Sequence, residues 1–72
     1  MEFDTLSDEE KASSIRSKIK NIQFQRYNVE LDVLMETAVT NPNDTYIAEL
    51  QAQIADMQLK QDALETELST LS

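Results

Sequence analysis

Residues 47–71 read IAELQAQIADMQLKQDALETELSTL. Apolar side chains recur in this segment at alternating intervals of three and four residues, which is the heptad spacing of a coiled coil. The predicted seam consists of Ile47, Leu50, Ile54, Met57, Gln61, Leu64, Leu68 and Leu71. Because only Gln61 interrupts this apolar edge, the segment predicts one long helix that packs lengthwise against another helix.

The segment 12–36 carries the matching stripe. Its members are Ala12, Ile15, Ile19, Ile22, Arg26, Val29, Val33 and Glu36. If the chain reverses between Asn41 and Pro42, residues equally distant from that point face each other. Every seam residue of one helix then faces a seam residue of the other, as Val29 faces Ile54. This agreement predicts an all-α fold, an antiparallel two-helix coiled-coil hairpin that packs into a larger helical bundle or assembly.

The start of the first helix has a local signature. Ser7 and Glu10 fit the Ser-x-x-Glu capping box, in which each side chain bonds the backbone N–H of the other residue. Asp8 and Glu9 add negative charge at the positive end of the helix dipole. We therefore expect the helix to begin at Asp8.

The reversal lies in Thr40-Asn41-Pro42-Asn43-Asp44. Asn41 as N-cap, with Pro42 as the first helical residue, starts the second helix in the favoured arrangement. A cap at Asn43 or Asp44 is the alternative. The predicted organisation is a lead-in segment at residues 1–7 and a helical hairpin at 8–72, with a helix at 8–40, a turn at 41–42 and a helix at 42–70.

Polar side chains are expected to reinforce the register. Arg26 and Gln61 lie one layer apart in the seam, within reach of each other. Flanking charges predict two further ion pairs, Arg16–Glu65 and Lys18–Glu67. Because exposed pairs contribute only about 0.2–1 kcal/mol each, they bias the orientation of the helices without holding the fold together.

Composition narrows the classes of function. The 72 residues carry a net charge of −8 and contain no cysteine, histidine or glycine. The charge disfavours nucleic acids and anionic membranes as partners. Without glycine there is no phosphate-binding loop, and a two-helix rod offers carboxylates no concave site in which to act on a small-molecule substrate. We therefore expect no catalytic residue, metal or cofactor. The sequence shows no signal peptide or membrane span, so we expect a cytoplasmic location.

A second set of apolar residues faces away from the seam on both helices. The predicted partner-binding residues are Phe24, Tyr27, Leu31, Leu34 and Met35 on the first helix and Ala52, Ala55 and Leu59 on the second. A hairpin alone leaves them in water, and contiguous apolar surface of this kind marks an interface. Large side chains on one helix and small ones on the other suit interlocking between neighbouring hairpins.

Charge is segregated along the chain. Residues 11–26 carry five bases and no acid, whereas Lys60 is the sole base after residue 26. The bases do not line one face, so they are expected to complement the second helix. The acids Glu49, Asp56 and Asp62 allow a second hypothesis, in which an acidic face mimics a nucleic-acid backbone.

These features predict a non-enzymatic structural or adaptor protein. Its partners are expected to be proteins, reached by self-association or within a larger complex. The alternative is a small acidic inhibitor that binds a host or partner protein, by nucleic-acid mimicry among other routes. The two hypotheses differ in which surface makes the contact: the outward apolar residues, or the carboxylates of the second helix.

Overall fold

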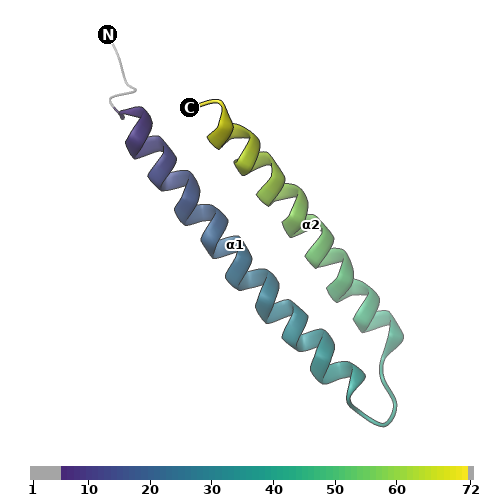
Figure 1. The fold of residues 1–72 in the computed structure, drawn as a ribbon. Helices are drawn as coiled ribbons and strands as arrows, with labels where there is room; N and C mark the ends of the chain where they lie inside the picture. The colour runs from purple at the N-terminus through teal and green to yellow at the C-terminus, as the bar shows by residue number, and fades with distance from the viewer. Residues whose placement is uncertain (1–5, 72) are drawn as a thin grey trace.

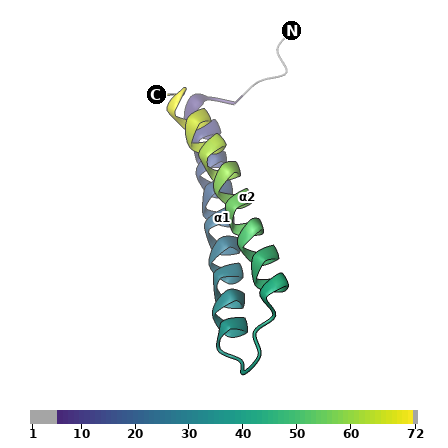
Figure 2. The same ribbon diagram turned by 90° about the vertical axis from the view of Figure 1, so that its right-hand side faces the viewer.

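A computed structural model describes residues 6–71 and shows a hairpin of two helices, α1 (Asp8–Thr37) and α2 (Asp44–Ser69). The helices run side by side in opposite directions, and the start of α1 lies near the end of α2 (Figures 1 and 2). The molecule is a rod measuring 60 × 21 × 15 Å. The predicted all-α hairpin is confirmed. Of the predicted lead-in segment, residues 1–5 lie outside the described residues.

The predicted capping box begins α1. Ser7 Oγ accepts from the backbone N–H of Glu10 at 3.2 Å, and Glu10 Oε1 accepts from the backbone N–H of Ser7 at 2.9 Å. The hydrogen bond from the Ser7 backbone N–H to this carboxylate, and after it the interaction with the Ser7 side chain, lower the pKa of Glu10 from its usual value of 4.5. The local signature therefore fixes where α1 begins.

The seam of the hairpin is formed by the residues that the heptads predict. All sixteen of them are buried or half-buried, and Ala12, Leu50 and Gln61 are the most enclosed, at 8%, 3% and 7% exposure. Within residues 6–71 the apolar core proper contains just Ala12 and Leu50. Two helices can shield each other on one side alone, so most seam residues keep an edge in water.

The polar layer of the seam differs from the predicted one. Arg26 donates a hydrogen bond to Gln58 Oε1 on the other helix. Its Nε lies 3.9 Å from Oε2 of Glu30, within the same helix. Gln61 Nε2 donates to Glu65 Oε2 at 3.1 Å, while the buried Gln61 Oε1 has no hydrogen-bond partner. Arg26 and Gln61 therefore do not bond each other. Each bonds a residue nearer the hairpin surface, Gln58 or Glu65, which its long side chain reaches more easily.

The turn is longer than predicted, and both helices are shorter beside it. Helix α1 ends at Thr37 rather than residue 40, and α2 begins at Asp44 rather than residue 42. Val39 and Thr40 are β-branched, and a residue before proline avoids the helical region, which explains the early end of α1. The second helix uses the alternative cap, since Asn43 Oδ1 accepts from Tyr46 N at 3.1 Å.

The two predicted ion pairs between the helices are wrong. Within residues 6–71, neither Arg16–Glu65 nor Lys18–Glu67 comes within ion-pair distance, and the pairs Arg26–Glu30 and Lys60–Asp56 each lie within one helix. Arg16 and Glu65 do line the same groove at the open end of the hairpin. Exposed charges at that spacing gain too little energy from pairing to offset the side-chain entropy that pairing costs.

Candidate protein-interaction surface

The outer face of α1 carries most of the exposed apolar surface. We call Phe24, Tyr27, Leu31, Leu34 and Met35 the α1 stripe. Four of them are more than half exposed: Phe24 at 59%, Tyr27 at 58%, Leu34 at 63% and Met35 at 61%. The fifth, Leu31, is half-buried. Spacings of three and four residues place them on one face of the helix, roughly 150° around from the seam by the rotation of about 100° per residue. The stripe therefore points away from α2.

The aromatic end of the α1 stripe has a polar border. Lys20, Gln23, Phe24 and Tyr27 line a shallow depression of about 200 Å³. Lys20 Nζ lies 5.6 Å from the centroid of the Phe24 ring, which is within the range of a cation–π contact. This end of the stripe thus presents aromatic surface together with one positive charge.

The outer face of α2 carries smaller side chains. We call Ala52, Ala55 and Leu59 the α2 stripe; all three are exposed, and Leu59 is 69% exposed. Ala48 and Ala63 extend the same face and are also exposed. Except at Leu59, this face has low side chains over which a larger residue from another helix can lie.

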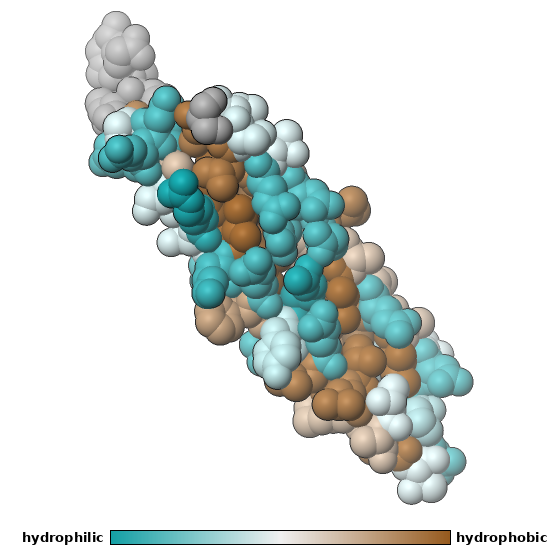
Figure 3. Space-filling view, viewed as in Figure 1, coloured by the Kyte–Doolittle hydropathy of each residue, from teal (hydrophilic) through white to brown (hydrophobic). Residues whose placement is uncertain are grey.

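The structure does not bring the α1 stripe and the α2 stripe together. Each lies on the side of its helix opposite the seam, so the two stripes occupy opposite edges of the hairpin. The space-filling view agrees, with hydrophobic surface along the line between the helices and also at both outer edges (Figure 3). The hairpin therefore offers two separate apolar edges rather than one patch.

Three features of the exposed surface escaped the sequence analysis. Lys20 was grouped with the other bases, although its i, i+4 spacing to Phe24 is the signal for the contact observed. Val39 and Tyr46 are 50% and 41% exposed. Both lie close to the turn, where the sequence predicts regular helix or a tight reversal and no role for either residue. Together they extend apolar surface towards the turn end of the hairpin.

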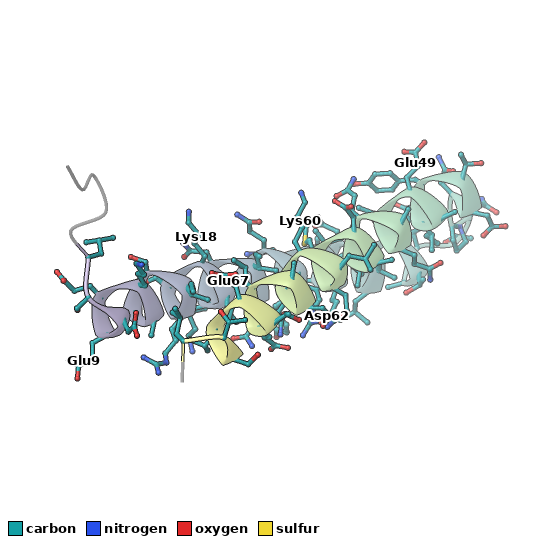
Figure 4. The ribbon with its side chains drawn as sticks, turned by 90° about the horizontal axis from the view of Figure 1, so that it is seen from above. Glu9, Lys18, Glu49, Lys60, Asp62 and Glu67 are labelled. Carbon is teal, nitrogen blue, oxygen red and sulfur yellow. The ribbon has the colours of Figure 1, made fainter. Side chains whose placement is uncertain are left out.

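The carboxylates of α2 are arranged differently from a continuous acidic face. Asp56 Oδ2 lies 3.3 Å from Lys60 Nζ, Asp62 accepts from Gln58 at 2.9 Å, and Glu65 accepts from Gln61. Glu49, Asp62 and Glu67 point in different directions from the helix (Figure 4). Within residues 6–71, no group of three acidic side chains is placed to hold a metal ion.

The open end of the hairpin contains a groove between the helices. Its volume is about 840 Å³, and it is lined by Asp8, Glu9, Ala12, Arg16, Glu65, Leu68, Ser69 and Leu71. Ala12 is small, which leaves space beside Leu68 and Leu71.

In the part of the chain that the structure describes, neither helix has a stretch long and apolar enough to span a membrane.

Comparison with known proteins adds no relative. A scan against family models, a search of curated proteins and a search of solved structures each gave no match. The function is therefore argued from the surface of this chain.

Proposed function

We propose that this chain is a non-enzymatic structural or adaptor protein that acts through protein–protein contacts of its outer apolar faces within a larger assembly. The observation that carries the proposal is the α1 stripe. Four large apolar side chains on one helical face are each more than half exposed. Removing such a surface from water is favourable by about 25 cal/mol per Å² of apolar area, so a partner helix that covers it gains binding energy.

The small core of the hairpin supports the same proposal. Ala12 and Leu50 are the two buried apolar residues among residues 6–71, and both keep some exposure. A chain of this size, with no disulfide to constrain its unfolded state, gains stability from helix–helix packing with another chain. Contact through an outer face therefore serves both binding and folding.

Within the α1 stripe, Phe24 and Tyr27 are the expected anchors. Aromatic side chains supply much buried area at low entropic cost, and a few such residues carry most of the energy of an interface. The cationic Lys20 beside Phe24 favours a partner with an acidic group next to an apolar surface. The proposed contact is thus apolar at its centre, with charge at one end.

The test is capture of partner proteins by the tagged chain from extracts of its source, at low and at high salt. We expect the specific partner to remain bound at high salt, because an apolar contact is little affected by charge screening. Phe24→Ala or Leu31→Ala should weaken binding at least ~10-fold, as loss of an interface anchor does. Gln25→Ala is the matched control, since Gln25 is exposed on α1 outside the stripe.

The opposite result would support the acidic inhibitor instead. Binding that is lost at high salt and survives Leu31→Ala rejects the apolar interface. Binding through Glu49, Asp56 and Asp62 would show that dependence, because added salt screens long-range attraction to a basic partner.

A further inference from the structure

The α1 stripe and the α2 stripe lie at matching heights along the rod. The register of the hairpin is marked by contacts between its helices: Arg26 bonds Gln58, and Ala12 lines the same groove as Leu71. Continued along the helices, this register sets Phe24 level with Leu59. It likewise sets Leu31 level with Ala52. The two faces are therefore at opposite edges of the rod but at the same distance from the turn.

We propose that the partner of the α1 stripe is the α2 stripe of a second copy of this chain. The inference rests on the proposed function and names the occupant of the surface. A second hairpin set beside the first in the same orientation brings its α2 against the first hairpin's α1. The two helices are antiparallel, as they are within one hairpin, and large side chains of the α1 stripe meet the alanines of the α2 stripe at the same heights.

The charges at the two faces are complementary. Residues 11–29 of α1 contain bases and no acid, and Lys20 stands one turn before Phe24 on the outer face. In the same register Asp62 of the neighbouring α2 lies close in height to Lys20. The sole base of α2, Lys60, is held by Asp56 at 3.3 Å. Towards the open end of the hairpin, where residues 11–29 lie, the contact therefore joins a basic edge to an acidic one.

Pairing of like faces lacks both forms of complementarity. Two α1 stripes would set large side chains against large side chains. Two copies of α2 would bring together two acidic helices and leave the α1 stripe in water. A contact between unlike faces leaves one free face on each copy, an α2 stripe on the first and an α1 stripe on the second, so it continues into a ring or an open row of hairpins.

Mixing two variants tests this arrangement. Phe24→Asp disables the α1 stripe and Leu59→Asp disables the α2 stripe at the same height; both side chains are more than half exposed, so the hairpin loses little of its own packing. We expect the unsubstituted chain to form species larger than a dimer in sedimentation, and each variant alone to be a helical monomer. An equimolar mixture should give a 1:1 dimer, because one intact face of each kind remains.

The other outcomes overturn the inference. If Leu59→Asp associates as the unsubstituted chain does while Phe24→Asp is monomeric, α1 pairs with α1. If the unsubstituted chain is monomeric at every concentration, the second copy is not the occupant. The proposed function then still stands or falls by the capture experiment. Leu31→Asp with Ala52→Glu is a second pair of variants, for use if either first variant loses its helical circular dichroism.

Cross-linking provides an independent measurement. The chain has no cysteine, so single cysteines can be placed at Asn28 and at Ala55, two exposed outer positions of equal height. A short bis-maleimide should link the chains in a mixture of Asn28→Cys and Ala55→Cys and leave each variant unlinked by itself. Links formed by Asn28→Cys alone would contradict the proposed pairing.

Discussion

Oε2 of Glu36, in the last turn of α1, accepts a hydrogen bond from the backbone N–H of Asn43 at 3.0 Å. Asn43 is the N-cap of α2. In a capping box the third residue of the helix returns a bond to the backbone N–H of the cap. That residue is Tyr46, which has no carboxylate. Glu36 therefore completes the cap of α2 from the preceding helix, and ties the two helices together across the turn.

Removal of this carboxylate is expected to weaken the turn. Glu36→Ala should lower the free energy of unfolding by ~0.5–1.5 kcal/mol, since one hydrogen bond and a favourable charge at the start of α2 are lost. Glu36→Gln keeps an acceptor oxygen and should lose less. Urea unfolding measures both, with Glu49→Ala as the control because Glu49 is an exposed glutamate farther along α2. Equal losses for Glu36→Ala and Glu49→Ala would show that the cross-turn bond contributes nothing.

A second substitution distinguishes the two asparagines of the turn. Asn43→Ala removes the side chain that accepts from Tyr46 N, and should cost about 1 kcal/mol, the usual effect of losing an N-cap. Asn41→Ala is the matched control, because the structure starts α2 after Asn43 and gives Asn41 no capping role. The urea midpoints of the two variants decide. A larger loss of stability for Asn41→Ala than for Asn43→Ala would indicate that Asn41 caps α2, as in the tight turn predicted from the sequence.

The polar layer of the seam is expected to cost stability. Gln61 is 7% exposed, and its Oε1 has no partner. Replacing it with leucine should raise the free energy of unfolding by about 1 kcal/mol or more, since an unsatisfied buried polar group costs ~1–3 kcal/mol. Gln58→Leu should give no such gain, because it removes the acceptor of Arg26. If Gln61→Leu is less stable than the unsubstituted chain in urea, the buried Gln61 stabilises the fold and the prediction is wrong.

The capping box of α1 predicts a pH dependence. Hydrogen bonds from Ser7 lower the pKa of Glu10 below 4.5, so the stability this carboxylate adds is fully present above pH 4.5 and is lost as the pH falls through the lowered pKa. NMR titration of Glu10 should show that pKa, and the Ser7 amide signal should follow the same curve. In Ser7→Ala the pKa of Glu10 should move back towards 4.5. Titration of Glu10 at or above 4.5 in the unsubstituted chain would contradict the account.

The parts of the fold that were predicted correctly have strong local or periodic signals. The seam from Ile47 to Leu71 repeats over several heptads, and Ser7 with Glu10 forms a cap within one turn of chain. The predicted position of the turn was wrong because Asn41 and Asn43 both suit an N-cap. The observed choice involves Glu36, whose contact crosses the turn and has no sequence signature.

The sequence predicted which apolar residues of the candidate surface face outward. It predicted the contacts among the charged residues around them less well. Heptad positions place the α1 stripe outward, and four of its five members are more than half exposed; Leu31 is the exception, half-buried. Pairings between exposed charges were not predictable, because they are worth too little for a pattern to fix them. The cation–π contact of Lys20 with Phe24 was missed because the basic residues were considered as a group.

If the chain acts through its outer apolar faces, the α1 stripe is covered when the protein is assembled. Labelling of a cysteine at Leu34 with a maleimide measures this directly, since the chain has no other cysteine and Leu34 is 63% exposed in the hairpin. A cysteine at Gln25, exposed outside the stripe, is the control. In the dilute chain both cysteines should react at similar rates. In the concentrated chain or the captured complex, the account predicts that Leu34→Cys reacts at least ~10-fold more slowly while Gln25→Cys is unchanged, as expected of a desolvated interface centre. Equal rates for the two cysteines in every assembled state would contradict it.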